Sequence, residues 1–563
     1  MKVIIVGGVA GGATAAARIR RLDEHAEITV FERSGYISYA NCGLPYYIGD
    51  VITDPEELTL QTPESFFKRF RINMKIHHEV ISIHPERKTV SVKNLENGEI
   101  FEENYDKLIL SPGAKPTQPR LPGVGMDKLF TLRTVEDTFR IKEYINKNHP
   151  KSAVLAGGGF IGLELAENLR ELGMDVTIVQ RPKQLMNPFD PDMASMIHNE
   201  MRKHGIKLVL GYTVEGFKEK DNGVEVLLKD NPSLQADMVV LAIGVTPDTV
   251  LAKEAGLELG IKESIVVNDR METSVPDIYA AGDAVQVKHY VTGNDALISL
   301  AGPANKQGRI IADNICGGDS RYLGSQGSSV IKVFDMTAAT TGINETNAKK
   351  SGLEVDTVIL SPMSHAGYYP GGKVMTMKVI FEKESYRLLG AQIIGYEGVD
   401  KRIDVLATAI HAGLNATQLK DLDLAYAPPY SSAKDPVNMA GFMIDNIAKG
   451  TLKQWHLEDM DKISKDKDVV LLDVRTVGEF SRGHIDGFKN IPVDELRERI
   501  SEIEKGKPVY LICQSGLRSY IASRILEGNG YETYNFSGGF RFYDAVVNDR
   551  ALIERAYACG MDY

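Results

Sequence analysis

Apolar residues near the N-terminus form two short runs separated by a helical segment, and this order predicts a βαβ unit. Residues 2–6 (KVIIV) and 27–31 (EITVF) are apolar runs of strand length, and residues 10–22 between them are alanine-rich. Glycines fill the turn before that segment. Short buried strands that alternate with helices are typical of a doubly wound parallel sheet. The same order returns at residues 152–180, so the pattern predicts two such units.

The pattern changes twice in the second half of the chain. Residues 326–445 alternate strand-like segments with one long helix at 400–413, which predicts an α+β domain. After a linker at 446–458, strands and helices alternate again over 459–563, which predicts a small independent α/β domain. We therefore expect a multidomain α/β protein, as a length of 563 residues requires.

Composition and charge narrow the function classes. The net charge of −11 disfavours general nucleic-acid binding. No apolar run reaches 18 residues, so no membrane span is expected, and the glycine-rich N-terminus fits a buried strand better than a signal peptide. The cysteines form no CxxC and no metal-ligand pair, so no metal site is expected. These features favour a cytoplasmic protein.

Both βαβ units carry a glycine-rich turn between strand and helix. Gly157, Gly159 and Gly162 match GxGxxG, whose glycines permit a tight turn and bring the backbone close to a pyrophosphate. In the first unit Gly7 and Gly12 hold the outer positions, but Val9 takes the middle one. A turn without a nucleotide is the alternative interpretation, but its position before a helix favours dinucleotide binding.

The residue that ends the second strand differs between the two units. Glu32 lies twenty residues beyond Gly12 and supplies the carboxylate that accepts ribose hydroxyl hydrogen bonds. The second unit has no such acid, because its strand leads into Gln180, Arg181 and Lys183. Arginine and lysine pair with a 2′-phosphate, so the second site favours NADPH or mixed use of NADPH and NADH.

Cys42 lies in the segment YISYANCGLPYYIG, directly after the first unit. A buried core cysteine is the alternative interpretation. The segment is nevertheless polar and contains glycine and proline, and Ser38, Asn41 and nearby backbone amides could hold a thiolate. We therefore predict a redox cysteine, whose thiol pKa the loop amides and a dinucleotide cofactor bound beside it would together lower.

The sequence resembles the pyridine nucleotide-disulfide oxidoreductase family and, within it, the coenzyme A disulfide reductases. The motifs GGVAGGATAAARIRR, SYANCGLPY, LILSPGAKP, GGGFIGLELAE, AIGVTPDT and IYAAGDAV carry this resemblance over residues 1 to about 445. It implies bound FAD and NADH or NADPH, with Asp283 on the ribityl chain of the flavin. The expected cofactor-binding residues are Gly7, Gly8, Ala10, Gly11, Gly12, Glu32, Arg33, Gly113, Gly157, Gly159, Phe160, Ile161, Gly162, Gln180, Arg181, Gly244, Gly282 and Asp283.

The resemblance also assigns the predicted domains. Two Rossmann-like domains bind FAD and NAD(P), an α+β domain mediates dimerisation, and a small α/β domain ends the chain. The expected boundaries are 1–115 and 246–325 for the FAD-binding domain, 116–245 for the NAD(P)-binding domain, 326–445 for the dimerisation domain, 446–458 for the linker and 459–563 for the C-terminal domain.

Cys42 has no second cysteine beside it. Most relatives have a CxxxxC pair, whereas this sequence has Tyr47 at the second position. The resemblance therefore implies a mixed disulfide between Cys42 and coenzyme A, which electrons from NAD(P)H reduce through the flavin.

Basic residues on the first helix are candidates for coenzyme A binding. Arg18 and Arg21 share a helix face by their spacing, although a solvated face is the alternative interpretation. The resemblance implies a coenzyme A channel lined by Thr14, Arg18, Arg21, Ser38, Asn41 and Lys434, joined by Arg69 or Arg71. It also implies that Tyr368 and Tyr426 reach the active site of a partner subunit, so that the protein is a homodimer.

The C-terminal domain contains a second candidate nucleophile. Cys513 follows an apolar strand and begins CQSGLRS, a loop whose amides point inward at a helix start and favour an anion. Arg518 closes the loop and could bind an oxyanion or phosphate. The C-x4-R spacing is one residue shorter than that of cysteine phosphatases, which favours sulfur transfer over phosphoryl transfer.

Residues 464–555 are similar to rhodaneses in VVLLDVRTVGEFSRGHIDGFKNIP, PVYLICQSGLRSYIASRILEGNGY and NFSGGF. This resemblance implies that Cys513 carries sulfane sulfur. The matching residues Asp473, Arg475, Glu479 and His484 are expected to stabilise the domain. Cys316 and Cys559 have no comparable context, and we assign them no role.

Together these features predict flavin-dependent reduction of coenzyme A persulfide, or a related persulfide or polysulfide, with release of thiol and hydrogen sulfide. Three alternatives stay open at this point. They are reduction of coenzyme A disulfide itself, an NADH oxidase or peroxidase that uses Cys42 sulfenic acid, and a non-enzymatic redox sensor or sulfur carrier.

Overall fold

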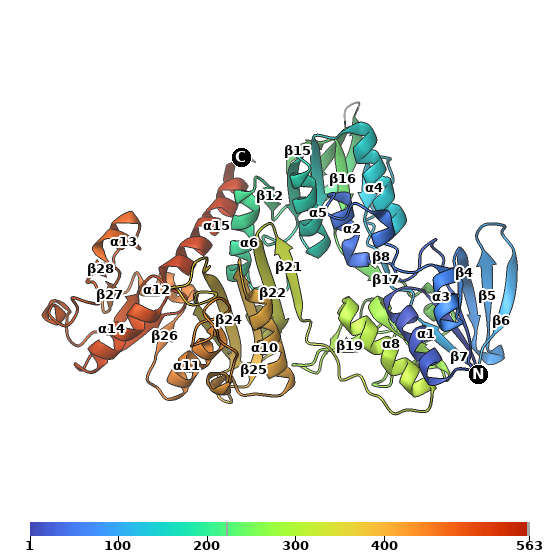
Figure 1. The fold of residues 1–563 in the computed structure, drawn as a ribbon. Helices are drawn as coiled ribbons and strands as arrows, with labels where there is room; N and C mark the ends of the chain where they lie inside the picture. The colour runs from blue at the N-terminus through green and yellow to red at the C-terminus, as the bar shows by residue number, and fades with distance from the viewer. Residues whose placement is uncertain (221–222, 560–563) are drawn as a thin grey trace. The chain divides into compact units, whose positions relative to one another are not determined.

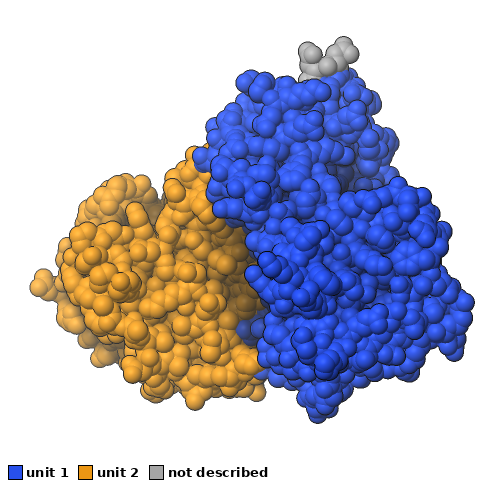
Figure 2. Space-filling model, turned by 45° about the vertical axis from the view of Figure 1, so that its right-hand side comes forward, with its two compact units in different colours: residues 1–182, 206–327 blue, residues 183–205, 328–563 orange. Residues whose placement is uncertain are grey.

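A computed structural model describes residues 1–220 and 223–559, with side chains up to residue 555 (Figure 1). Two compact units make up the chain, and Figure 2 colours them separately. Unit 1 contains Met1–Pro182 and Ile206–Gly327, and unit 2 contains Lys183–Gly205 and Ser328–Tyr563. Within the described residues no helix is both long and apolar enough to span a bilayer.

The first sheet of unit 1 confirms the N-terminal βαβ prediction. The parallel strands β1 (Lys2–Val6) and β2 (Glu27–Phe31) flank helix α1 (Ala10–Leu22) in the chain. The strand order is β18-β7-β1-β2-β3, with β3 (Asn73–Lys75), β7 (Lys107–Leu110) and β18 (Ile278–Ala280) completing the sheet. Since β18 comes from a distant segment, the first domain is built from two parts of the chain.

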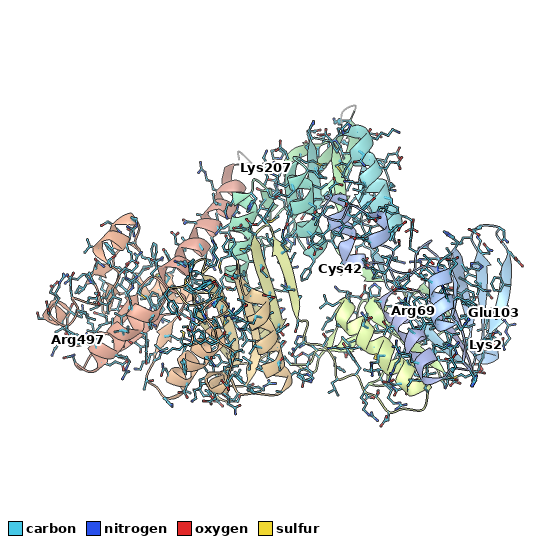
Figure 3. The ribbon with its side chains drawn as sticks, in the orientation of Figure 1. Lys2, Cys42, Arg69, Glu103, Lys207 and Arg497 are labelled. Atoms are coloured by element: carbon cyan, nitrogen blue, oxygen red, sulfur yellow. The ribbon has the colours of Figure 1, made fainter. Side chains whose placement is uncertain are left out.

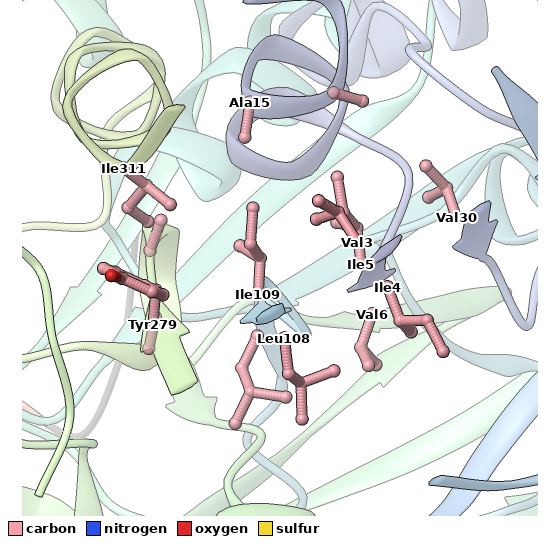
Figure 4. Close-up of a cluster of buried hydrophobic side chains, with 14 of the residues drawn as sticks. Val3, Ile4, Ile5, Val6, Ala15, Val30, Leu108, Ile109, Tyr279 and Ile311 are labelled. Atoms are coloured by element: carbon pink, nitrogen blue, oxygen red, sulfur yellow. The ribbon is translucent and has the colours of Figure 1, made fainter. Parts of the chain in front are cut away.

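The core of this sheet lies beneath two helices. Val3, Ile5 and Ile109 are fully buried in the strands, and Ala15 of α1 and Ile311 of α8 (Ala301–Ile315) cover the same face (Figure 4). Small alanines on α1 let the helix approach the sheet closely, so that the glycine turn before it lies at the carboxyl end of β1.

The second sheet of unit 1 repeats the arrangement, as the 152–180 pattern predicts. Strand β10 (Ser152–Ala156), helix α5 (Phe160–Glu171) and strand β11 (Asp175–Gln180) form the βαβ unit. The strand order is β12-β11-β10-β16-β9, all parallel, with β9 (Leu129–Thr131), β12 (Lys207–Leu210) and β16 (Met238–Leu241). The carboxyl ends of β10 and β11 therefore meet at the turn that opens α5.

Each doubly wound sheet of unit 1 is accompanied by an antiparallel meander that the sequence analysis did not assign. The meanders contain β4 (His78–His84), β5 (Thr89–Asn94) and β6 (Ile100–Asn104), and β13 (Val214–Lys220), β14 (Gly223–Leu228) and β15 (Asn231–Ala236). Lys2 Nζ lies 2.8 Å from the carboxylate of Glu103 on β6, and Figure 3 labels both residues. This ion pair ties the first meander to the start of β1.

Unit 2 begins with an antiparallel sheet that agrees with the predicted α+β domain. Its order is β21-β22-β25-β24-β23, formed by β21 (Ser329–Val333), β22 (Met336–Gly342), β23 (Val355–Leu360), β24 (Met375–Glu382) and β25 (Leu388–Gly395). The predicted helix 400–413 is α10 (Val399–His411), and it ends before Gly413, whose φ is 69°. Helix α11 (Pro436–Ala448) follows.

Helix α6 (Pro191–Lys203) follows β11 in the chain but packs within unit 2. The buried amine of Lys378 on β24 lies 3.2 Å from Asp190, 2.8 Å from Asp192 and 2.7 Å from Glu345. An amine this deep in the protein requires carboxylate partners, so these contacts hold the start of α6 on the sheet. This segment was expected within the domain at 116–245, and its packing within unit 2 was not predicted.

The C-terminal part of unit 2 has the predicted parallel sheet, in the order β26-β30-β29-β27-β28. Its elements include β26 (Gln454–Trp455), β27 (Val470–Asp473), α13 (Val477–Arg482), β28 (Lys489–Asn490), β29 (Val509–Ile512), α14 (Leu517–Glu527), β30 (Thr533–Phe536) and α15 (Gly539–Cys559). Buried Asp549 of α15 accepts from His198 Nδ1 at 2.8 Å and pairs with Arg202, which joins α15 to α6.

Candidate functional site

The first glycine turn has no room for side chains and opens at the start of α1. Gly7 has a φ of 98°, and a Cβ there would lie 2.1 Å from the oxygen of Ser111. A Cβ on Gly12 would lie 2.0 Å from the Gly7 oxygen. The Glu32 carboxylate accepts from the Gly8 amide at 2.8 Å and so lies beside the turn. These residues fit the pyrophosphate and ribose of a dinucleotide such as FAD.

The second turn has the same geometry with one chemical difference. Gly157 has a φ of 120°, and a Cβ there would lie 2.2 Å from the oxygen of Ala242. Gln180 accepts from the Gly158 amide at 3.0 Å, in the role that Glu32 has in the first turn. No atom would crowd a Cβ at Gly159 or Gly244, so this turn also fits a dinucleotide. The amide of Gln180 lacks the negative charge that favours a free ribose hydroxyl.

Cys42 lies on a short helical turn, Asn41–Gly43, that leads into α2 (Leu44–Ile48) (Figure 3). Helix α2 packs closely on α5, because a Cβ added to Gly49 would lie 2.0 Å from Asn168 Oδ1. The Cys42 thiol is exposed at the protein surface. The redox segment of the first domain thus sits against the nucleotide-binding helix of the second.

The predicted lowering of the Cys42 pKa rested partly on a bound flavin, and the protein groups around the thiol do not produce it. Surrounding protein atoms, and next the negative charge of Glu164, raise the pKa of Cys42, while Arg133 opposes them. Glu164 lies on the first turns of α5 and is itself perturbed. Burial and then Glu167 raise the pKa of Glu164 to about 7, against a hydrogen bond with Tyr46. Cys42 is therefore coupled to a carboxyl group that titrates near neutral pH.

Arg133 connects three parts of this site and was missed by the sequence analysis. It donates to the Asp283 carboxylate at 2.9 Å and to the Ala114 carbonyl at 3.1 Å. With its amide oxygen towards Arg133, Asn41 accepts from Nη1 at 2.9 Å and donates to the Arg133 carbonyl at 3.1 Å. No spacing signal marks this arginine, since its partners come from distant segments.

Of the residues in unit 1 that are expected to bind coenzyme A, some are exposed and others have partners within the protein. Arg18 Nε pairs with Asp313 at 2.8 Å, and the Thr14 hydroxyl donates to Asn305 at 2.5 Å. Arg21 and Arg69 are exposed, and Arg69 lies on α3 (Pro63–Phe70) (Figure 3). Arg71 ends that helix, with its guanidinium 5.2 Å from the Phe67 ring centre. Their role towards coenzyme A stays a prediction.

Other expected binding residues lie as follows. The Ser38 amide donates to the Gly8 carbonyl at 2.9 Å, which places Ser38 beside the first turn. Arg33 pairs with Asp248 at 2.9 Å, and Gly113 and Gly282 both have positive φ. Lys434 is exposed and belongs to unit 2.

Tyr368 and Tyr426 lie together in unit 2, and their hydroxyl oxygens are 2.8 Å apart. Their side chains are far from core positions, with 76% of Tyr368 and 45% of Tyr426 exposed. Buried Arg402 of α10 braces this region, because it donates to the Ser364 carbonyl at 2.9 Å and pairs with Asp435 at 3.0 Å. The structure thus presents two phenols side by side, and their action in a partner subunit stays a prediction.

Cys513 follows β29 and is fully buried at the base of its loop. Its sulfur accepts from the Gly516 amide at 3.1 Å and from the Ser519 hydroxyl at 3.2 Å. Gly516 has a φ of 96°, which turns the loop into α14. Two donors aimed at one sulfur stabilise an anion there, as the loop pattern predicts.

Arg518 has a partner that the sequence did not indicate. Its two terminal nitrogens each donate to the Glu479 carboxylate, both at 2.7 Å. This pairing lowers the pKa of Glu479 to about 2. The expected framework roles fit Asp473 and Arg475, which form a buried ion pair at 2.7 Å. His484 stacks on Phe480.

The remaining cysteines add no site. Cys316 is half-buried at the end of α8, and burial is the main cause that raises its thiol pKa. The side chain of Cys559 lies outside the described residues.

The two glycine turns and the cysteine between them define a flavin- and nicotinamide-type disulfide reductase fold, and family comparisons agree. A model of the pyridine nucleotide-disulphide oxidoreductases matches residues 1–308, and a model of their dimerisation domain matches 328–436. A model of the rhodanese-like domain matches residues 456–545. The chain belongs to the pyridine nucleotide-disulphide oxidoreductase family and carries a C-terminal rhodanese-like domain.

Particular relatives share this architecture. The coenzyme A disulfide reductase of Staphylococcus aureus (strain JH9) is 38% identical over 442 residues, which are 78% of this chain and 99% of that protein. The crystal structure of reduced Bacillus anthracis CoADR-RHD is 49% identical, with a TM-score of 0.95 and 98% of both chains covered. The NAD-dependent persulfide reductase from A. fulgidus is 39% identical, with a TM-score of 0.90, over 96% of this chain and all of that one, 100%.

Proposed function

We propose that this protein reduces coenzyme A persulfide, or a related persulfide, with NAD(P)H. The observation that carries the proposal is the presence in one chain of two different sulfur sites, an exposed Cys42 beside the nucleotide turns and a cradled Cys513 in a rhodanese-like loop. The relatives described as coenzyme A disulfide reductase and persulfide reductase support this substrate class. The net reaction converts R–S–SH and NAD(P)H into R–SH, HS⁻ and NAD(P)⁺.

The residues around Cys42 have defined parts in this reaction. The Cys42 thiolate attacks the inner sulfur of the persulfide, forms Cys42–S–S–R and releases HS⁻. Gly7, Gly12 and Glu32 would hold a flavin, which would supply the electron pair from NAD(P)H for cleavage of this disulfide. Glu164 acts electrostatically on Cys42 and holds the proton that the thiol loses or gains, since its pKa is raised to about 7, and Tyr46 hydrogen-bonds to Glu164.

The dimer is part of the proposal. The match to the family's dimerisation domain supports a homodimer. In this proposal the exposed hydroxyls of Tyr368 and Tyr426, 2.8 Å apart, donate a proton to a leaving thiolate in a partner subunit. A reducing compartment such as the cytoplasm suits this thiol chemistry.

Cysteine variants test the function. Cys42→Ser should lower persulfide-dependent NAD(P)H oxidation and sulfide release by about 1,000-fold or more, because no other described thiol lies in the redox segment. Cys513→Ser should retain turnover of small free persulfides but lose turnover of bulky donors. Cys316→Ser is the matched control and should behave like the wild type. Full activity of Cys42→Ser would overturn the proposal.

The second nucleotide site is proposed to accept NADPH or both nicotinamides. Gln180 occupies the place that Glu32 has in the first turn, without its charge. Gln180→Glu should shift the ratio of kcat/KM values towards NADH by about 10-fold, because a carboxylate binds a ribose hydroxyl and repels a 2′-phosphate. An unchanged ratio would place the cofactor preference elsewhere.

A further inference from the structure

The arginine of the rhodanese-like loop, Arg518, forms an ion pair with Glu479. Both terminal nitrogens of Arg518 donate to Glu479 at 2.7 Å, one to each carboxylate oxygen. Such a bidentate pair fixes the guanidinium in one geometry and neutralises its charge. Glu479 therefore competes with an anionic substrate for Arg518, on which the charge of Cys513 also acts.

Glu479 is fixed as firmly as the arginine that it holds. Its Oε2 atom also accepts from the amide and the hydroxyl of Thr476, at 3.0 Å and 2.9 Å, in a capping box at the start of α13. The hydrogen bonds from Arg518, followed by those from Thr476, lower the pKa of Glu479 to about 2. The carboxylate is consequently ionised throughout the physiological pH range.

Among the described residues, the sulfur of Cys513 accepts hydrogen bonds only from neutral donors. These are the Gly516 amide and the Ser519 hydroxyl. Neutral donors suffice for a thiolate or a persulfide, which carry one negative charge. A dianion such as thiosulfate, which releases a second dianion, sulfite, needs a free cation close to the sulfur.

Apolar residues adjoin the ion pair in sequence and are exposed. Val477 begins α13 two residues before Glu479, and Leu517 begins α14 directly before Arg518. Their exposed fractions are 61% and 65%, and Ile521 on the next turn of α14 is 43% exposed. These side chains offer contact to the organic part of a donor rather than to a small hydrated anion.

We infer that Glu479 sets the donor specificity of the C-terminal domain, so that Cys513 accepts sulfane sulfur from organic persulfides and discriminates against thiosulfate. This inference rests on the proposed function and names its donor class. The favoured step is Cys513–S⁻ + R–S–SH → Cys513–S–SH + R–S⁻, in which the bond between the two donor sulfurs breaks. The disfavoured step is Cys513–S⁻ + S₂O₃²⁻ → Cys513–S–S⁻ + SO₃²⁻.

Glu479→Gln in the full-length holoprotein tests the inference. Glutamine retains the capping position, since Glu and Gln both serve there, but releases the charge of Arg518. The rate of Cys513 persulfidation is followed by peptide mass spectrometry without NAD(P)H, with glutathione persulfide or thiosulfate as donor. In the wild type, Cys513 should react with thiosulfate about 100-fold more slowly than with glutathione persulfide. Glu479→Gln should raise the rate with thiosulfate about 10-fold, because it releases a charged hydrogen bond from Arg518.

Glu502→Gln is the matched control, because it disrupts a similar carboxylate pair with Arg499 in the same domain. It should leave both rates unchanged. A wild-type rate with thiosulfate equal to that with persulfide, or an unchanged thiosulfate rate in Glu479→Gln, would overturn the inference. If Cys513 accepted sulfur from neither donor, the sulfur-transfer part of the proposed function would also be overturned. Loss of NAD(P)H oxidation with normal persulfidation of Cys513 would instead contradict only the role proposed for Cys42.

A second measurement needs no variant. Sulfate resembles the oxyanion end of thiosulfate, so binding at a free Arg518 would protect Cys513 from alkylation. We expect no protection by sulfate in the wild type. Protection in the wild type would contradict the inference even if Glu479→Gln did not fold.

Discussion

The two cysteine sites of this chain favour opposite protonation states, the thiolate at Cys513 and the neutral thiol at Cys42. Cys513 is fully buried and receives two hydrogen bonds from its own loop, at 3.1 Å and 3.2 Å. Cys42 is exposed, and its protein surroundings, with Glu164, raise its thiol pKa. In the proposed function Cys513 carries sulfur, which requires local stabilisation of its anion, whereas a cofactor and a substrate would stabilise the anion of Cys42.

The largest test of this comparison removes one hydrogen bond at Cys513. Ser519→Ala deletes the hydroxyl that donates to the sulfur. Loss of a hydrogen bond to a charged group costs about 1.5–3 kcal/mol, so persulfidation of Cys513 at pH 7 should slow by about 10- to 100-fold. The rate is measured by quenching the reaction at timed intervals and quantifying the persulfidated Cys513 peptide by mass spectrometry.

Ser523→Ala is the control for this variant, because its hydroxyl on the same helix donates to the Tyr520 carbonyl and not to sulfur. Equal rates for Ser519→Ala and Ser523→Ala would show that the loop amides alone hold the anion.

A smaller effect is expected at Cys42. Glu164→Gln removes a negative charge that raises the pKa of Cys42, so the pKa of Cys42 should fall. Alkylation of Cys42 by iodoacetamide at pH 7 should become about threefold faster, since charges across a partly solvated gap interact by about 1 kcal/mol or less. Glu171→Gln, at the exposed end of α5, should leave the pH profile unchanged. If the pH dependence of Cys42 alkylation in Glu164→Gln equalled that of the wild type, Glu164 would have no electrostatic effect on Cys42.

The last prediction concerns stability and pH, with an effect of the same order as that at Cys42. Burial and Glu167 raise the pKa of Glu164 from 4.5 to about 7, so the folded protein binds more protons here than the unfolded chain between these values. The contribution is fully present below pH 4.5 and is lost as pH rises through 7. Relative to Glu164→Gln, the wild type should lose on the order of 1 kcal/mol between pH 5 and pH 8. Calorimetry gives the unfolding midpoints of both proteins, and a difference between them that stayed constant from pH 5 to pH 8 would contradict this prediction.

Local sequence patterns predicted the elements around each glycine turn well. Residues 2–6 and 10–22 coincide with β1 and α1, because a short apolar strand and an alanine-rich helix follow from local patterning. Cys513 was also placed correctly at the base of its loop, since the loop donors are its own neighbours in the chain. The meanders and the packing of α6 in unit 2 had no comparable local signal.

Side-chain partners from distant segments were not predictable. Burial and Glu164 raise the pKa of Cys42, and no local pattern indicated this because Glu164 lies more than one hundred positions away in the chain. Arg133, which meets Asp283 and Asn41, was absent from the expected site for the same reason. Arg518 was identified as an anion binder, but its pairing with Glu479 depends on how α13 and α14 meet.

The sequence by itself determined the chemistry that is available: two dinucleotide turns, one cysteine without a neighbouring partner, and a rhodanese-like loop. These follow from residue types at short spacings, where backbone geometry leaves few alternatives. Only the tertiary structure decided the charge around each group. It placed Glu164 near Cys42 and Glu479 on Arg518, because electrostatic interactions depend on distance in space rather than on separation along the chain.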